Sequence, residues 1–208
     1  MKNMFAPPRN RHRRAARIVL SFVALLLAAG LSGCVGLAVG AGATAGTAAM
    51  QERGIGGAID DTVIHAKITG SYYNNDVAFK LIAVKVHEGR VLLTGTVPKP
   101  KDRIAAVRHA WKVDGVKTVI NEITVEDNSD VLDLARDKWV TAQLRLKITF
   151  DGKIKAINYA IDTVNGTVYL MGIAQNETEL TLVRNHARNI EYVRRVVSHA
   201  RLKNTPSS

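Results

Sequence analysis

NGTVYLMG, residues 165–172, is a tight hairpin turn followed by a strand, because Asn-Gly supplies the two positive φ angles that a two-residue hairpin requires. The stretch EGRVLLTG, residues 88–95, stands 77 residues earlier and carries glycines, a valine and a leucine in the same positions. His109 and Ala110 match His186 and Ala187 at the same offset. The sequence therefore predicts two copies of one small unit.

In both copies, the spacing of apolar residues along the sequence changes in the same order around this hairpin. Helical spacing comes first, then two strands joined by the turn, then a second helix and a β-branched strand. Asn176 stands at the predicted N-cap of a second helix, with Glu179 three residues further on. The predicted elements are 59–72, 83–87, 91–97, 101–113 and 116–125 in the first copy, and 131–149, 159–163, 167–174, 177–190 and 193–202 in the second.

This order predicts an α+β fold made of two tandem αββαβ domains, over residues 59–126 and 131–203. In each domain, a three-stranded mixed sheet buries one face under two helices, with a right-handed crossover through the second helix. A unit of about 65 residues has a marginal core. Two such domains would be more stable if they packed together or were supported by a membrane, and residues 126–130 are expected to form a polar joint between them.

The amino-terminal part has the composition of a signal peptide followed by a tether. Residues 2–17 hold six cations and no acid, and the uncharged run 18–30 is too short to span a bilayer as a mature helix. We predict a signal peptide over residues 1–33. Residues 34–58 are mostly Gly, Ala and Thr, which predicts a tether, and Cys34 is the only cysteine, so no disulfide can form.

Removal of the predicted signal peptide changes what the net charge implies. The whole chain has a formal charge of +11, and loss of the six cations leaves +5. A modest basic excess does not indicate a nucleic-acid partner. It suits a protein that works beside anionic lipid headgroups, so the membrane surface is the expected partner.

Two short segments resemble known bacterial families. Leu31-Ser32-Gly33-Cys34 resembles the lipobox of lipoproteins, which implies cleavage before Cys34 and its acylation. Val35, where an Asp would favour the inner membrane, implies a lipid anchor on the periplasmic face of the outer membrane. The Val-x-Leu-x-Gly glycines of residues 91–95 and 168–172, with the valines that close each copy, resemble the BON domain of envelope proteins.

Outer-membrane lipoproteins with two such domains are the best match to the whole predicted mature chain. The resemblance implies binding of anionic phospholipid, phosphatidylglycerol in particular, through the first helix of the second domain. It also implies localisation to sites of membrane remodelling such as the division septum, and a role in envelope integrity. The alternative is a protein adaptor that docks an envelope assembly or stress-response factor.

The residues of the predicted helix 131–149 support the same site independently. On a helical wheel, Val140, Leu144 and Ile148 form one stripe, which we assign to the core. A second stripe, more than about 100° away, carries Trp139 and Leu146. An indole and a leucine between cations suit the membrane interface. The predicted phospholipid-binding residues are Trp139, Leu146, Lys138 and Arg145.

The first copy does not repeat this pattern, because Val63 replaces Trp139 and Gly70 replaces Leu146. The alternative for the second stripe is burial against the first domain. Trp111, in the first copy's second helix, has Arg188 at its place in the second copy and is expected in the core or at a domain interface.

Catalytic and metal motifs are missing from the sequence. His109 and His186 occupy equivalent positions, but no second histidine, cysteine or carboxylate stands at metal-ligand spacing beside both, so repeat inheritance explains them. Paired acids such as Asp60-Asp61 are interpreted as capping and solvating residues at a helix start. We expect no enzyme activity, no metal, no cofactor and no small-molecule substrate.

Overall fold

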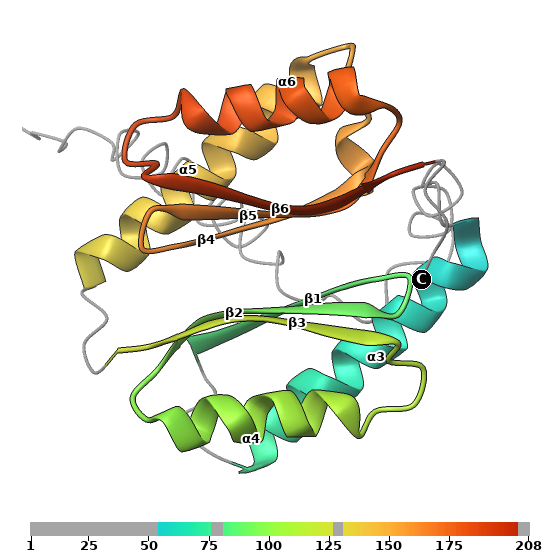
Figure 1. Ribbon diagram of the computed structural model, residues 1–208, viewed down its shortest axis with the longest axis vertical. Helices are drawn as coiled ribbons and strands as arrows, with labels where there is room; N and C mark the ends of the chain where they lie inside the picture. Colours follow the sequence, from blue (N-terminus) through green and yellow to red (C-terminus); the bar gives the residue numbers. More distant parts are fainter. Residues whose placement is uncertain (1–53, 76–80, 127–130, 204–208) are drawn as a thin grey trace, which may run out of the picture. The chain divides into compact units, whose positions relative to one another are not determined.

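The computed structural model describes residues 54–75, 81–126 and 131–203 (Figure 1). All of them belong to one compact unit, Thr44–Ser208. The predicted signal peptide, Cys34 and the tether up to residue 53 lie outside the described residues. Every hydrophobic cluster described below lies inside Thr44–Ser208, so this part of the chain contains the cores that it needs to fold on its own.

The predicted α+β fold and the αββαβ order of both copies are confirmed. The first domain consists of α3 (Gly54–Asn75), β1 (Ile82–His87), β2 (Arg90–Val97), α4 (Pro100–Trp111) and β3 (Thr118–Val125). The second consists of α5 (Val131–Phe150), a short 3-10 turn (Ala156–Asn158), β4 (Tyr159–Val164), β5 (Thr167–Ala174), α6 (Glu177–Arg188) and β6 (Arg195–Leu202). Asn176 caps α6 as predicted, because its side chain accepts a hydrogen bond from the Glu179 N–H at 2.9 Å.

Each domain contains the predicted three-stranded mixed sheet. The middle strand, β2 or β5, pairs antiparallel with the strand before it and parallel with the last strand. Both turns have the positive φ angles that the sequence predicts, 55° and 75° at Glu88 and Gly89, and 49° and 69° at Asn165 and Gly166. The hairpins therefore fix the register of both sheets in the same way.

Each sheet buries one face under its own two helices. In the second domain, Val140, Leu144 and Ile148 of α5 are fully buried against β4 and β5, which confirms the predicted core stripe. Ile64 and Ile68 of α3 do the same in the first domain. The helix α3 begins at Gly54, within the stretch that the sequence assigns to the tether, and Ala58 of this first part is already buried.

A buried carboxylate connects the first helix of each domain to the hairpin turn. Asp61 accepts hydrogen bonds from the backbone N–H groups of Glu88 and Gly89 at 2.7 and 2.8 Å. Asp137 of α5 accepts the equivalent pair from Asn165 and Gly166 at 2.7 and 2.9 Å. The interpretation of Asp61 as a solvated cap is therefore wrong, because its carboxylate leaves water to satisfy two turn donors.

The glycine of each Val-x-Leu-x-Gly segment is required by the neighbouring strand. Gly95 and Gly172 have φ angles of 117° and 137°. A Cβ at Gly95 would lie 2.0 Å from the Leu81 carbonyl oxygen, and one at Gly172 would lie 1.9 Å from that of Asn158. Only glycine fits this approach of two backbones.

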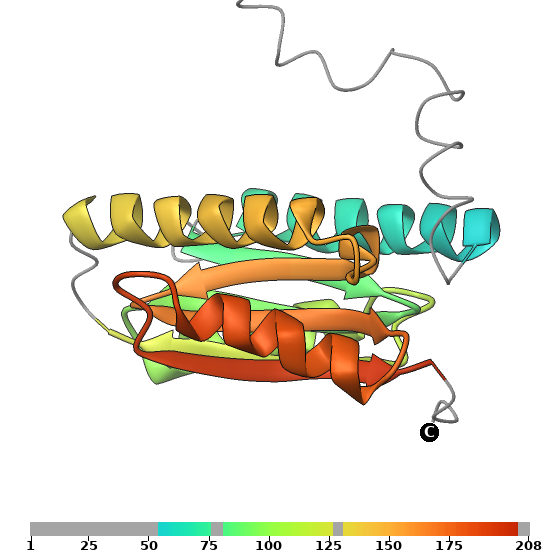
Figure 2. The same ribbon diagram turned by 90° about the horizontal axis from the view of Figure 1, so that it is seen from above.

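The two sheets face each other through the sides that their helices leave uncovered. Leu92 of β2 packs with Tyr169 and Met171 of β5 in a small apolar cluster. Beside it, the buried Thr94 hydroxyl donates to a carboxylate oxygen of Asp162 at 2.5 Å. Helices α3 and α4 therefore cover one outer side of the paired sheets, and α5 and α6 cover the other (Figure 1). Seen from above, α3 and α5 lie in one row along the same edge (Figure 2).

Candidate functional site

The candidate site is the outward face of α5. Trp139 and Leu146 expose 42% and 51% of their surface, whereas Val140 and Leu144 beside them in the sequence are fully buried. Lys138 and Arg145 are exposed as well. The alternative that Trp139 and Leu146 pack against the first domain is wrong, because the domain contact is made by the sheets and not by this face.

The apolar stripe is longer than the sequence analysis predicts. Leu132 lies seven residues before Trp139 and is 54% exposed, and Phe150 lies four residues after Leu146 and is 83% exposed. On the wheel, all four side chains fall within about 40° of one another. We call Leu132, Trp139, Leu146 and Phe150 the α5 stripe. The spacing of Leu132 and Phe150 is a signal that the sequence already contained.

Tyr192, in the loop between α6 and β6, joins the stripe from outside the helix. Its ring meets that of Trp139 edge to face, with centroids 5.8 Å apart, and the Arg136 guanidinium lies 5.3 Å from its centre. A hydrogen bond to Glu191 raises the pKa of the Tyr192 phenol. The edge of the stripe is therefore aromatic and borders a cation.

Cations lie on both sides of the α5 stripe. On the wheel, Lys138 and Arg145 fall on one side, and Arg136 and Lys147 on the other. Arg136 also pairs with Asp133 at 3.1 Å and lines a cavity of about 400 Å³ together with Tyr192 and Arg194. This face of α5 can thus place its indole and other apolar atoms in an apolar medium. The four cations can at the same time contact anions at the edge of that medium.

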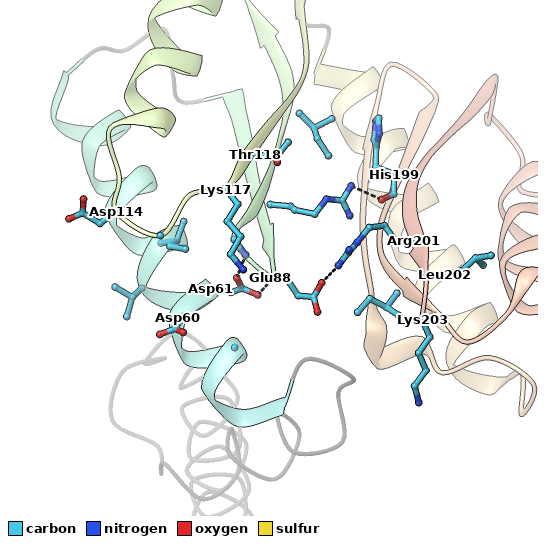
Figure 3. A pocket seen from close by; sticks show the side chains of 18 residues that line it. Asp60, Asp61, Glu88, Asp114, Lys117, Thr118, His199, Arg201, Leu202 and Lys203 are labelled. Atoms are coloured by element: carbon cyan, nitrogen blue, oxygen red, sulfur yellow. Dashed lines mark hydrogen bonds and ion pairs between the residues drawn. The ribbon is translucent and has the colours of Figure 1, made fainter. Parts of the chain in front are cut away.

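A second cavity, of about 880 Å³, lies between the two domains (Figure 3). Arg201 pairs there with Glu88, and Arg90 donates to the His199 carbonyl oxygen at 3.1 Å. Burial, and then the nearby charge of Arg201, lower the pKa of Arg90. Beside the cavity, His199 bonds to Glu122 of β3 at 2.8 Å. These groups are used by contacts between β6 and the first domain, so we interpret this region as the polar part of the domain joint.

The equivalent histidines have unrelated partners. His109 meets the Ser71 hydroxyl at 3.0 Å, and His186 meets the Asp151 carboxylate at 2.8 Å. Among the described residues, no group of three or more His, Cys, Asp or Glu could hold a metal ion. Within that same part of the chain, no helix is both long and apolar enough to cross a bilayer.

Trp111 corrects a prediction. The sequence analysis expects it in the core or at a domain interface, but its side chain is 51% exposed. It is the last residue of α4, and the apolar side chains that this helix buries in the core are the small ones of Ala106 and Ala110.

The class of protein is defined by two αββαβ units, each with a helix aspartate bound to its hairpin turn and a glycine that the neighbouring backbone requires. The chain belongs to the BON domain family, which matches residues 60–127 and 136–204. Within this class it is a dual-BON protein of the DolP type.

Individual relatives cover most of the chain. The outer membrane lipoprotein DolP of Haemophilus influenzae is 32% identical to it, over 86% of this chain and 94% of that protein. An uncharacterized protein from the gshII 5' region of Anaplasma centrale is 43% identical, over 71% of this chain and 97% of its own length. The 21 kDa hemolysin of Actinobacillus pleuropneumoniae is 28% identical, over 73% of this chain and 78% of that protein.

Proposed function

We propose that this protein is a lipoprotein anchored at Cys34 to the periplasmic face of the outer membrane. In this proposal the second BON domain binds anionic phospholipid, phosphatidylglycerol in particular, through α5, and thereby supports envelope integrity. The lipobox-like Leu31-Ser32-Gly33-Cys34 and the name of the DolP relative support the location. The α5 stripe supports the contact.

The observation that carries the proposal is the α5 stripe itself, four large apolar side chains exposed along one line between cations. Apolar surface removed from water contributes about 25 cal/mol per Å², and a cation near an anionic bilayer contributes about 1 kcal/mol. Because the acyl anchor already holds the protein at the membrane, a contact of modest intrinsic affinity is sufficient.

The equivalent face of α3 supports assigning this role to α5 and not to its counterpart helix in the first domain. Val63 stands at the position of Trp139, and Gly70 at that of Leu146. Val63 is also exposed, so the two faces have similar access to solvent and differ in their side chains. A Val and a Gly offer little apolar surface to a bilayer.

A charge substitution in the α5 stripe tests the proposal. With the unit Thr44–Ser208 and vesicles that contain phosphatidylglycerol, we expect Trp139→Glu to lower the affinity at least about tenfold, or about 1.4 kcal/mol, because a carboxylate then meets anionic headgroups. Co-sedimentation measures binding, and circular dichroism checks the fold. The matched control is Val63→Glu on α3, which should bind as the unchanged protein does. Equal binding by Trp139→Glu would contradict the proposal.

Lipid charge and salt separate this function from that of a protein adaptor. Attraction between exposed cations and anionic headgroups weakens as salt rises, whereas an apolar protein interface changes little. We therefore expect binding to phosphatidylglycerol vesicles to fall between low and physiological salt, and binding to pure phosphatidylcholine vesicles to be weak throughout. Equal binding to both vesicle types would favour the adaptor.

A further inference from the structure

A second exposed apolar face lies on α4 of the first domain. Ile104 is 58% exposed and Trp111 51% exposed. The two residues stand seven apart and therefore share one side of the helix, opposite Ala106 and Ala110, which are fully buried against the sheet. We call Ile104 and Trp111 the α4 stripe.

The exposed charges of α4 itself have one sign, and the exposed Asp114 stands beyond the end of the helix. Lys101, Arg108 and Lys112 are exposed and fall beside the stripe on the wheel. Asp102 is the only acid of α4, and it is buried. The outward side of α4 therefore combines an indole, an aliphatic side chain and cations, and the helix itself adds no exposed carboxylate.

The internal repeat shows that this stripe does not belong to the common BON framework. At the equivalent positions of α6, Thr181 replaces Ile104 and Arg188 replaces Trp111. Conversely, α3 lacks the stripe of α5. Each domain thus carries one exposed apolar stripe, on α4 in the first domain and on α5 in the second. The counterpart helices, α6 and α3, carry no such stripe. Exposed side chains that add nothing to either core indicate a contact surface.

The two stripes lie on opposite outer sides of the unit. The sheets face each other through Leu92, Tyr169 and Met171. Helix α4 lies on the far side of the first sheet, and α5 on the far side of the second (Figure 1). Because each stripe faces away from its own sheet, one flat bilayer cannot receive both at once.

We infer that the α4 stripe is a second contact for anionic bilayers and that the unit can join two bilayer surfaces, one on α5 and one on α4. The occupant is argued from charge complementarity, since an indole among cations, on a helix without an exposed acid, suits an anionic headgroup layer. The joining of two bilayer surfaces rests on the proposed lipid contact of α5. The α4 contact by itself does not depend on that proposal.

Vesicle clustering tests this inference. Thr44–Ser208 is mixed with vesicles of phosphatidylcholine with and without phosphatidylglycerol, and light scattering reports clustering while co-sedimentation reports binding. We expect the unchanged unit to cluster the anionic vesicles only. Trp111→Glu should still bind through α5 but cluster the vesicles at least about tenfold less. The matched control is Thr181→Glu on α6, which should cluster normally.

A second pair of variants measures the α4 contact directly. Trp139→Glu weakens the α5 stripe, so the residual binding of this variant should depend more on α4 and fall further when Trp111→Glu is added. If the residual binding does not change, or if Trp111→Glu clusters vesicles normally, the inference is wrong and a protein becomes the candidate occupant of α4. Failure of the proposed function would look different, because the single variant Trp139→Glu would then bind vesicles as well as the unchanged protein does. Ile104→Gln replaces Trp111→Glu if that variant does not fold.

Discussion

Tyr192 combines a strained backbone conformation with a side chain that contacts the candidate site. Its φ of 68° lies in the left-handed region, where the first domain has Gly115 with a φ of 90°. For a residue other than glycine, this conformation costs about 1–2 kcal/mol. The contacts of its ring with Trp139 and Arg136 offset part of that cost, about 0.5–1.5 kcal/mol for the aromatic pair and about 0.5–1 kcal/mol for the cation. The strained backbone therefore serves to place an aromatic ring beside the stripe.

Replacement of this tyrosine should separate stability from binding. In Tyr192→Gly, the relief of strain and the loss of ring contacts nearly cancel, so we expect the free energy of unfolding to change by less than about 1 kcal/mol. Vesicle affinity should fall several-fold, because Trp139 loses its neighbour. Urea unfolding and co-sedimentation measure the two effects. Tyr192→Phe keeps the ring and should bind normally; an equal loss in this control would assign the effect to the hydroxyl instead.

At the scale of elements, the contact between helix and hairpin is the feature that both domains share. Asp61 and Asp137 each satisfy two backbone donors of a turn that lies more than 25 residues away in the chain. The same helix, α5, thus holds its hairpin with Asp137, fills the core with Val140 and Leu144, and presents the α5 stripe outward. Hence the hairpin contact also fixes which way the stripe faces.

Removal of the carboxylate should therefore destabilise the second domain. In Asp137→Ala, two buried N–H groups lose a charged acceptor, and we expect the free energy of unfolding to fall by about 3 kcal/mol. Chemical denaturation measures the change. The matched control is Asp133→Ala, one turn earlier on α5, which breaks only a half-exposed pair with Arg136 and should cost less than about 0.5 kcal/mol. Equal effects of the two variants would rule out a special role for the hairpin contact.

The elements themselves were predictable because their signals are local. The spacing of Val140, Leu144 and Ile148, the Asn-Gly turn and the Asn176 cap each act within a few residues. The Asp137 contact was not predictable in this way, since a single acid in a helix carries no sign of a distant turn. Trp111 was mispredicted because a large aromatic residue beside Ala110 resembles a core position, whereas only the small side chains face the sheet.

At the scale of the whole unit, two small domains become one body through a joint that is partly polar. The apolar cluster of Leu92, Tyr169 and Met171 is small, and the Thr94 to Asp162 hydrogen bond is buried beside it. The sequence left open whether the domains pack together, and through which faces. Strands with both faces apolar, such as β5, were the available signal.

The buried hydrogen bond should measure how strongly the domains are coupled. Thr94→Val keeps the shape of the side chain but leaves the Asp162 carboxylate without its donor, so we expect a loss of about 2 kcal/mol and a lower midpoint in calorimetry. Thr124→Val is the control, because its hydroxyl makes a longer bond, 3.3 Å, within the first domain. If the two variants lose equal stability, the bond between the domains contributes nothing of its own.

The length of α5 has a consequence for how such a protein would respond to membrane composition. From Leu132 to Phe150 the stripe extends about 27 Å, at 1.5 Å per residue. A helix that lies along a bilayer over this distance touches several headgroups at the same time, and its flanking cations would each need an acidic one nearby. Occupancy would then rise more steeply than in proportion to the mole fraction of acidic lipid, and the protein would accumulate where such lipids are locally enriched.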